Sequence, residues 1–277
     1  MERGSAAARR RSSPGAEAGV SSLPTRFGWT SAAATDKGHV RQVNEDAFLD
    51  RPDIGLWAVA DGMGGHEAGD LASRLVVETL ATTPPPRFLG RTVFDVRDRL
   101  AAVNRRLRAA AAEQGRGLIG STVVAMVALG GRCVLLWAGD SRAYRLRGGR
   151  LERLSHDHSH VQELVDRGLL AREAAESHPA ANIVTRAVGA DETLDVDSQM
   201  HEIRDGDSYL LCTDGLTKEI SEPRIRDILA QDSVPEAAAA LVRQACTRGA
   251  RDNVTAVVVR FSIKTAIPPR GLSPNSA

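Results

Sequence analysis

Short, continuously apolar segments joined by tight links constrain the fold of this chain more than any other feature. The segments LWAVA (56–60) and VLLWA (134–138) are apolar at every position, so other layers are expected to cover both faces of each strand. The GGR turn between Leu129 and Val134 is too short for a helical crossover, which favours antiparallel pairing. We therefore predict an α+β sandwich of mainly antiparallel sheets. The same pattern disfavours a Rossmann fold or a barrel of parallel strands.

Periodicity divides the chain into one large domain between two tails. A length of 277 residues with 42% apolar side chains is enough for a single core. Residues 1–26 and 264–277 are rich in Ala, Arg, Ser, Gly or Pro without an apolar period, so we expect disordered tails around a domain at 27–263. Strands are predicted at Thr30–Thr35, Ala47–Asp50, Leu56–Ala60, Thr122–Leu129, Val134–Ala138, Ser208–Cys212 and Val254–Phe261. Helices are predicted at about 67–81, 94–114, 158–168, 171–177, 222–231 and 235–248.

Charge, cysteine content and hydropathy favour a cytoplasmic protein. The 36 basic and 35 acidic side chains leave a formal net charge of +1, which gives no reason to expect nucleic acid or a membrane surface as partner. Cys133, Cys212 and Cys246 form no CxxC pair, which argues against a disulfide framework and fits a reducing compartment. The sequence shows neither a signal-peptide pattern nor a run of the ~18 apolar residues that a membrane helix needs.

Carboxylates follow three predicted strands at the point where each strand ends. Asp61 follows LWAVA, Asp140 follows LLWAG and Asp214 follows YLLCT. A fourth, Asp252, comes just before VTAVVVRF. Because the start of one antiparallel strand lies beside the end of its neighbour, all four can meet at one rim of the sheets. A single Asp-Gly pair is equally well explained as a turn, but that explanation does not account for four.

Further residues extend this rim into a candidate metal and phosphate site. Glu45 and Asp46 also precede a strand, so up to six carboxylates would converge. Such like charges repel unless they are protonated or neutralised by a hard cation, and oxygen donors select Mg²⁺ or Mn²⁺ over zinc or copper. Gly62 can offer its carbonyl to such an ion. Arg41 can bind a phosphoryl group bidentately beside the ions, although an ordinary surface arginine is the simpler alternative.

Two other patterns receive weaker support. HDHSH places His156, His158 and His160 in alternation, but no downstream Cys or His completes a zinc-ligand spacing, so a polar loop entering a helix is the better interpretation. Ser141 lacks the GxSxG elbow of a nucleophilic serine, and no His is placed to suggest a triad. Covalent serine catalysis is therefore disfavoured.

A set of ordered motifs extends these observations to residues 28–262. The motifs are GHVRQVNEDAF, WAVADGMGGHEAGDLAS, GSTVVAMV, LLWAGDSRAYRLRGGRLERLSHDHS, NIVTRAVG, LLCTDGL and RDNVTAVVV. In this order the chain resembles the metal-dependent protein phosphatases of the 2C type, the PPM family, and especially their bacterial branch. The resemblance implies a four-layer α-β-β-α sandwich, in which helices flank two antiparallel sheets and metal ions lie in a channel at one edge.

The resemblance also implies a set of metal ligands. Asp61 would bridge two Mn²⁺ or Mg²⁺ ions, and the Gly62 carbonyl would bind one of them. Asp214 and Asp252 would bind the other ion. Asp140, together with Asp214, matches the position of a third ion in bacterial relatives.

Other roles follow from the same resemblance. Glu45 and Asp46 would hold metal-bound waters, and Arg41 would grip the substrate phosphate while a metal-bridging hydroxide attacks phosphorus in line. Animal relatives carry a His two residues after the bridging aspartate, whereas this chain has Met63. Since Met cannot donate a proton, a metal-bound water or His66 would have to protonate the leaving oxygen.

These observations favour a phosphoserine and phosphothreonine protein phosphatase that opposes a cytoplasmic Ser/Thr kinase. Its flap, at about 159–188, would bring His178 and Arg186 to the substrate. One alternative is a pseudophosphatase that only binds phosphoproteins; the presence of all four aspartates speaks against it. A second alternative is a hydrolase of small phosphate esters, which the sequence leaves open.

Overall fold

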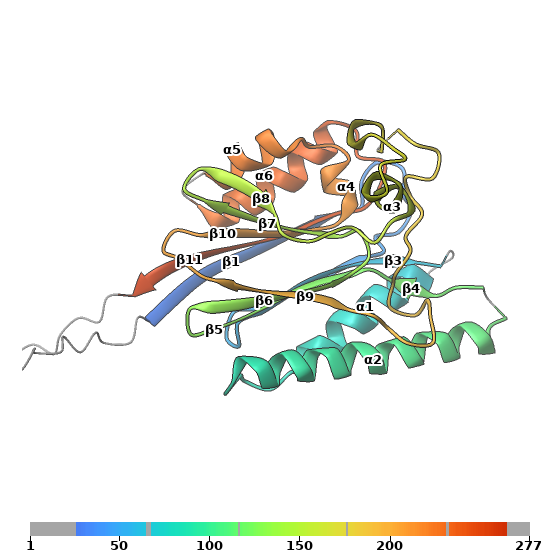
Figure 1. Cartoon of the computed structure of the whole chain (residues 1–277), viewed down its shortest axis with the longest axis horizontal. Helices are drawn as coiled ribbons and strands as arrows, with labels where there is room; N and C mark the ends of the chain where they lie inside the picture. Colours follow the sequence, from blue (N-terminus) through green and yellow to red (C-terminus); the bar gives the residue numbers. More distant parts are fainter. Residues whose placement is uncertain (1–25, 65–67, 116, 176, 231–232, 265–277) are drawn as a thin grey trace, which may run out of the picture.

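The computed structural model describes residues 26–64, 68–115, 117–175, 177–230 and 233–264, which form four layers (Figure 1). Helices α1 (Ala68–Ala81) and α2 (Leu89–Glu113) cover the outer face of one sheet. Helices α5 (Glu222–Leu229) and α6 (Val234–Thr247) cover the outer face of the other. The predicted α-β-β-α sandwich is confirmed.

Eleven strands and three shorter helical segments complete the described elements. The strands are β1 (Arg26–Asp36), β2 (Asp46–Arg51), β3 (Leu56–Met63), β4 (Gly120–Ser121), β5 (Val123–Leu129), β6 (Arg132–Ala138), β7 (Arg142–Arg147), β8 (Arg150–Arg153), β9 (Asp197–Glu202), β10 (Ser208–Cys212) and β11 (Val254–Lys264). The helical segments are α3 (His160–Asp166), the 3-10 turn η1 (Arg172–Ala174) and α4 (Asp214–Thr217). Within the described ranges, no helix is both long and apolar enough to cross a membrane.

Both sheets are antiparallel throughout the described pairs. One has the order β1-β11-β10-β7-β8, and the other has the order β2-β3-β5-β6-β9 with β4 paired to β3. The β5–β6 link is a tight hairpin, because Gly130 and Gly131 both adopt positive φ, at 57° and 81°. Two consecutive residues of this kind are what a type I′ hairpin turn requires, so the expected antiparallel link is confirmed.

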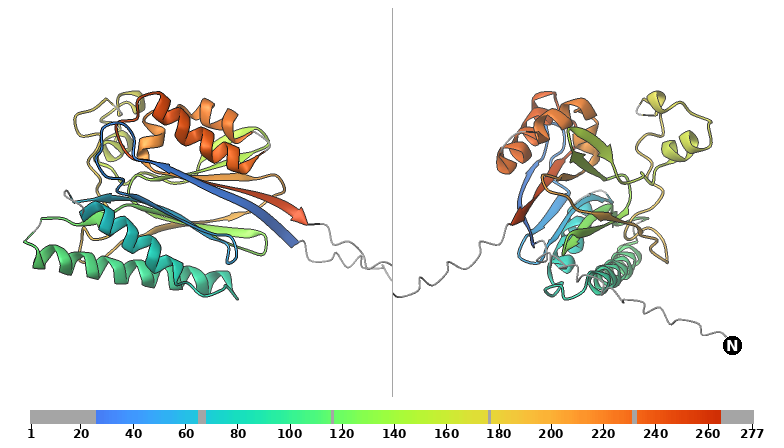
Figure 2. Two further views of the ribbon diagram at one scale, coloured as in Figure 1. Left: turned by 180° about the vertical axis from the view of Figure 1, so that it is seen from behind. Right: turned by 60° about the vertical axis from the view of Figure 1, so that its left-hand side comes forward.

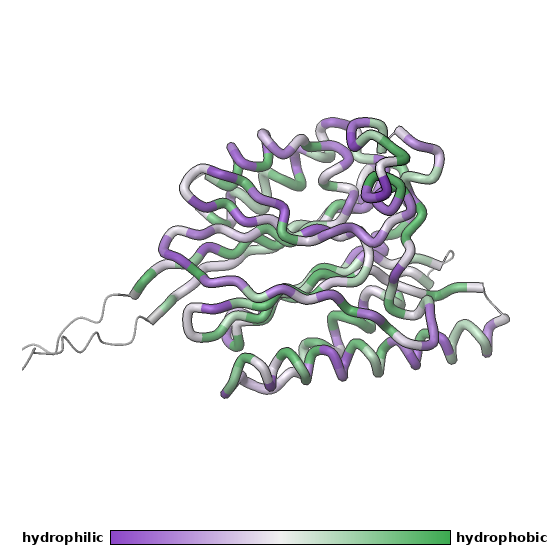
Figure 3. The backbone as a smooth tube through the Cα atoms, in the orientation of Figure 1, coloured by the Kyte–Doolittle hydropathy of each residue, from purple (hydrophilic) through white to green (hydrophobic). Residues whose placement is uncertain are grey.

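Side chains that alternate along the strands form three apolar cores. One lies between the two sheets, and each of the other two lies between one sheet and its helices. In β3, Trp57 and Val59 face the opposite sheet, whereas the alternating residues Leu56, Ala58 and Ala60 pack on the side of α1 and α2. In β11, Val257 packs between the sheets while Val258 faces α6. Because every second residue serves a different core, both sides of these strands must be apolar. Figure 3 shows the resulting hydrophobic stretches along the strands of both sheets.

The predicted strands are all present, but the sequence did not indicate β4, β7, β8 or β9. The edge strand β9 is mostly exposed, with the sequence DSQMHE, so it lacks the apolar alternation on which strand prediction depends. The predicted helix at 171–177 is wrong, since η1 is only a single 3-10 turn. Its alanines have helical propensity, but no apolar stripe anchors this segment to a core.

The first and last described strands lie side by side. β1 and β11 pair along their whole lengths, from Arg26 opposite Lys264 to Asp36 opposite Val254. The sequence assigned residues 26 and 264 to the tails, and the structure corrects this, because both take part in the sheet. The remainder of the two predicted tails, 1–25 and 265–277, lies outside the described residues.

The predicted flap is an excursion between β8 and β9 that carries α3 and η1. Figure 2 shows this part of the chain standing out from the side of the sandwich. Its two ends are joined by backbone hydrogen bonds, from His160 N to Ile183 O at 2.9 Å and from Thr185 N to His158 O at 2.8 Å. A short antiparallel bridge therefore fixes the base of the flap.

Candidate active site

The predicted carboxylates gather at one end of the sandwich. β2 and β3 are paired so that Asp46 lies directly opposite Asp61. Asp214 opens α4 immediately after β10 ends, and Asp252 precedes β11, the neighbour of β10. Asp140 follows β6 and is almost fully buried. The antiparallel register thus brings together residues that are far apart in the sequence.

Three of these aspartates lie in surroundings that disfavour their charge. Burial raises the pKa of Asp46 to about 7, although Thr213 Oγ1 donates a hydrogen bond to its Oδ2 at 2.8 Å. Burial, followed by repulsion from Asp214, raises the pKa of Asp140 to about 7. Burial and the neighbouring carboxylates, Asp46 first, raise the pKa of Asp61 well above its ordinary range. The cluster therefore stores electrostatic repulsion that a bound cation would relieve.

Unsatisfied oxygens show where such a cation would find donors. Asp46 Oδ1 and Asp214 Oδ1 are buried and have no hydrogen-bond partner, which is costly for a charged oxygen. As the side chains stand, no group of three or more His, Cys, Asp and Glu in the described ranges is placed to hold an ion. The donor chemistry nevertheless fits a hard divalent cation, because every candidate donor is oxygen.

Two basic side chains neutralise part of this charge. Arg41 donates from Nε and Nη2 to the two carboxylate oxygens of Asp252, at 2.8 and 3.2 Å. Lys218 Nζ lies 2.5 Å from Asp214 Oδ2 and 3.8 Å from Asp252 Oδ2. Burial acts to lower the pKa of Lys218, but attraction to Asp214, and then to Asp252 and Asp140, outweighs it and raises the pKa. The sequence analysis missed Lys218; its signal was the i,i+4 spacing from Asp214.

A buried asparagine positions the loop that carries Arg41 and Glu45. Asn253 Nδ2 donates to the carbonyls of Lys37 and Val43, at 2.9 and 3.1 Å, and its Oδ1 accepts from Glu45 N at 2.8 Å. These bonds tie the loop between β1 and β2 to the start of β11. Asn253 is a second residue that the sequence analysis missed.

Close backbone packing fixes Gly62 and the Glu45 side chain. A side chain at Gly62 would collide with the carbonyl of Gly69 in the first turn of α1, so the glycine is required by this approach. Gly62 N also donates to the carbonyl of Glu45 at 3.0 Å. Glu45 Oε1 lies against Gly69, where an added Cβ would come within 2.5 Å of it. Glu45 therefore stands between the loop and the start of α1.

A cavity of about 580 Å³ opens between the carboxylates and the flap. Arg41, Asp140, Asp214 and Asp252 line it on the side of the sandwich, and His178 lines it on the side of the flap. Asp46, Asp61, Glu45 and Gly62 are not among the lining residues. The predicted site is thus divided into residues that face the cavity and residues that lie behind them.

The structure places Arg186, unlike His178, away from the cavity lining. Its Nη1 lies 2.9 Å from Asp195 Oδ2 and 3.3 Å from Asp197 Oδ1. Arg186 is therefore engaged with the segment that leads into β9. Substrate contact by Arg186 stays a prediction that would require this pair of bonds to be exchanged.

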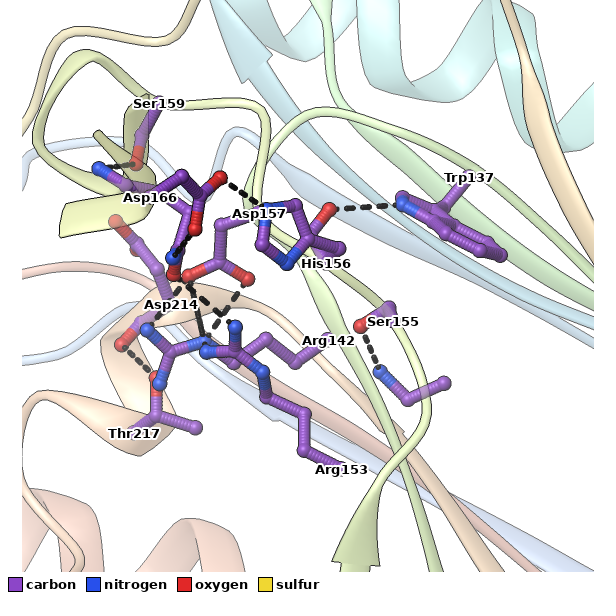
Figure 4. Close-up of polar contacts among 12 residues, drawn as sticks. Trp137, Arg142, Arg153, Ser155, His156, Asp157, Ser159, Asp166, Asp214 and Thr217 are labelled. Carbon is purple, nitrogen blue, oxygen red and sulfur yellow. Dashed lines mark hydrogen bonds and ion pairs between the residues drawn. The ribbon is translucent and has the colours of Figure 1, made fainter. Parts of the chain in front are cut away.

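A network of charged side chains holds the base of the flap (Figure 4). The buried carboxylate of Asp157 accepts from Arg142 Nη2 at 2.7 Å and lies 3.5 Å from Arg153 Nη1. Farther along, Asp166 of α3 pairs with His156 Nε2 at 2.7 Å. Since Arg142 and Asp157 also line the cavity, the same contacts that fix the flap shape the wall of the site.

The histidine-rich loop leads into α3, with Ser159 as the N-cap, as the sequence favoured. His158 is buried, stacks on Trp137, accepts from Gly139 N at 3.2 Å and lies 3.2 Å from Asp197 Oδ2. Gly139 immediately precedes Asp140, so His158 helps to place that carboxylate. His66, one of the proposed proton donors, lies outside the described residues.

Comparisons with known proteins agree with this geometry. Residues 35–253 match the family model of protein phosphatase 2C. The chain is 38% identical over 231 residues to the serine/threonine protein phosphatase PstP of Mycobacterium tuberculosis, covering 82% of this chain and 44% of PstP. It is 35% identical over 238 residues to the serine/threonine phosphatase Stp of Listeria welshimeri, covering 83% of this chain and 94% of that protein. The chain thus spans less than half the length of PstP but almost all of Stp.

Solved structures give the same result. PppA, a regulatory component of the T6SS in Pseudomonas aeruginosa, superposes with a TM-score of 0.80 at 47% identity, covering 85% of this chain and all of that chain. The catalytic domain of PstP, solved in complex with two manganese ions, superposes with a TM-score of 0.77 at 36% identity, covering 86% of this chain and all of that one. The chain belongs to the protein phosphatase 2C family and is similar to its bacterial members.

Proposed function

We propose that this protein hydrolyses phosphoserine and phosphothreonine in other proteins with the help of two bound Mn²⁺ or Mg²⁺ ions. One observation carries the proposal: an excess of carboxylates, two of them with buried and unpartnered oxygens, lies at and directly behind a cavity that Arg41 also lines. Structural ion pairs do not require such an excess, whereas two-metal phosphate chemistry does. The two manganese ions in the PstP catalytic domain support the same assignment.

The aspartates divide between ligands of the ions and residues that support them. Asp61 and the Gly62 carbonyl would hold one ion, with Asp61 shared by the second, which Asp214 and Asp252 would complete. Asp140 with Asp214 would offer a third position. The ions, when bound, would supply a nucleophilic water and neutralise charge on the transferring phosphoryl group.

Glu45 and Asp46 would orient water in this site through their carboxylates. Asp46 Oδ1 is suited to that role, because it is buried and unpartnered while Oδ2 is held by Thr213. The Glu45 carboxylate lies against Gly69 in the first turn of α1. These positions allow both residues to act without a direct bond to an ion.

Arg41 would bind the phosphoryl oxygens of the substrate. Its side chain is half-exposed and lines the cavity, so it can turn from Asp252 toward an incoming phosphate once that carboxylate has another cation partner. A planar guanidinium matches two phosphoryl oxygens at once. Arg41 would thereby fix the phosphorus for in-line attack.

The flap would contribute the protein side of substrate recognition. His178 lines the cavity, and its Nδ1 accepts from Ala180 N at 3.1 Å, so the neutral ring carries its proton on Nε2. Met63 has no proton to give to the leaving oxygen. We assign His178 to substrate contact and the leaving-group proton to a water in the site.

The substrates would be proteins phosphorylated on Ser or Thr. The partners would include a Ser/Thr kinase and the proteins that this kinase phosphorylates, and the protein would oppose that kinase in the cytoplasm. The bacterial relatives Stp and PstP are named as serine/threonine phosphatases, which supports that class of substrate.

The decisive experiment is phosphate release from a phosphothreonine peptide by the full chain with Mn²⁺, with Mg²⁺ and with EDTA. We expect turnover with metal and none with EDTA. Asp214→Asn should abolish it, whereas Asp227→Asn, an exposed aspartate on α5 outside the cavity, should not. Peptide binding without turnover in the metal-loaded wild type would establish a pseudophosphatase instead. Faster turnover of a small aryl phosphate than of the peptide would favour the small-ester alternative.

A further inference from the structure

We propose that Lys218 is a built-in counterion of the metal site, which a divalent cation must displace from Asp214 in order to bind. The inference rests on the proposed function and adds to it a residue that sets how much metal the protein needs. Lys218 lies at the C-terminal end of α4, four residues after Asp214, and lines the cavity.

The lysine contacts acids from two different elements. Its Nζ lies 2.5 Å from Asp214 Oδ2 in α4 and 3.8 Å from Asp252 Oδ2 before β11. Asp140, which follows β6, also attracts it. These are the carboxylates to which the proposed function assigns metal ions. The ammonium group therefore occupies the electrostatic position that a divalent cation would take.

An ordinary helix pair does not account for this arrangement. α4 contains only four residues, from Asp214 to Thr217, so an i,i+4 pair has little helix to stabilise. Asp252 belongs to another element, and the other carboxylate oxygen of Asp214 is buried without a partner. A salt bridge that leaves one oxygen unsatisfied is poorly suited to a purely structural role.

The Lys218 side chain is also able to move away from the two aspartates. Its side chain is 37% exposed, and among the described residues its ion-pair partners are Asp214 and Asp252. A flexible four-carbon stem allows Nζ to move into the cavity without a change in the backbone. Displacement of Lys218 would then be part of metal binding and would weaken the apparent affinity.

The test is calorimetric titration of Mn²⁺ into the metal-stripped full chain. Lys218→Gln should bind Mn²⁺ about fivefold more tightly than wild type, since a competing, partly exposed ion pair has been removed. Lys218→Arg keeps the charge and should bind like wild type. Arg106→Gln removes an equal charge from the exposed face of α2 and controls for net charge. It should also match wild type.

Thermal unfolding gives a second measurement. If Lys218 had no part in metal binding, its substitution would not change how much Mn²⁺ raises the Tm. In EDTA, Lys218→Gln should melt below wild type, because the carboxylates lose their counterion. Saturating Mn²⁺ should raise its Tm by more than it raises that of wild type. Circular dichroism at low temperature checks that each variant is folded.

Each outcome decides the matter. Unchanged or weaker Mn²⁺ binding by Lys218→Gln overturns the proposal, and a rise in KM for phosphopeptide with unchanged Mn²⁺ affinity would place Lys218 on the substrate instead. If the wild type itself binds no Mn²⁺, the proposed function fails, and the inference fails with it. If the wild type binds Mn²⁺ normally and only the variant effect is missing, the proposed function stands without the inference.

Discussion

Buried aspartates occur in two regions of this molecule, and only one of them provides matching cations. In the structural region, Asp207 is fully buried and accepts from Arg147 Nε and Nη2 at 2.7 and 2.6 Å, and from Arg204 N at 2.8 Å. Asp157 is similarly buried against Arg142. In the active-site region, Asp46 and Asp140 are buried beside other carboxylates with too few cations, and burial raises the pKa of each to about 7.

The presence or absence of a cationic partner separates carboxylates that stabilise the fold from carboxylates that are suited to bind a cation. A buried charge with a bidentate arginine repays much of its desolvation cost. A buried charge beside other carboxylates does not, and it persists only where the surrounding structure is stable enough to tolerate it. The contrast is testable, because removing a charge should have opposite effects on stability in the two regions.

The largest effect is expected for Asp61→Asn. We expect kcat/KM for a phosphothreonine peptide to fall roughly 10³-fold, since the substitution removes a carboxylate to which the proposed function assigns the metal ions. At the same time the free energy of unfolding of the metal-stripped protein should rise by about 1 to 2 kcal/mol, because the repulsion around Asp61 is relieved. Peptide kinetics and urea denaturation in EDTA measure the two quantities.

The sign of the stability change is what makes this variant informative. A loss of activity accompanied by a loss of stability would mean that Asp61 supports the fold, and the contrast between the regions would fail. Asp227→Asn, on the exposed surface of α5, serves as the control and should alter neither quantity.

The next effect is expected for Asp157→Asn, which should lower the free energy of unfolding, whereas Asp61→Asn should raise it. The substitution leaves Arg142, with 21% of its side chain exposed, without a full countercharge. We expect a loss of about 2 to 3 kcal/mol in the free energy of unfolding. The peptide KM should rise as well, because Asp157 and Arg142 both line the cavity and anchor the flap. An unchanged urea midpoint would contradict this assignment.

The sequence predicted the central strands because their requirements are local. Residues 56–60 of β3 and all of β5 need apolar side chains, since each strand faces two cores, and such runs are visible in the sequence. β8 and β9 lie at the edges of the sheets and are held mainly by backbone pairing, which leaves little trace in side-chain pattern. The failed helix at 171–177 shows the converse, since propensity without burial did not produce a helix.

The sequence predicted those site residues whose place beside a strand can be recognised locally. It did not predict residues whose role depends on contacts with other parts of the chain. Asp61, Asp140 and Asp214 follow recognisable strands, so their convergence could be expected. Asn253 acts through bonds to the loop before β2, from Lys37 to Glu45, and no local pattern reveals contacts across such a separation in sequence. Lys218 had only its spacing from Asp214, a pattern shared by many ordinary helix pairs.

The smallest effect is expected for Asp166→Asn, which sharpens the comparison by making the same substitution in an exposed pair of the same network. Asp166 pairs with His156 at 2.7 Å, much as Asp157 pairs with Arg142, but the two side chains are 47% and 52% exposed. Water screens such a pair, so the free energy of unfolding should change by less than about 1 kcal/mol. Urea denaturation of the two variants in parallel measures the difference. A cost equal to that of Asp157→Asn would show that membership of the flap network, and not burial, determines the energy of these pairs.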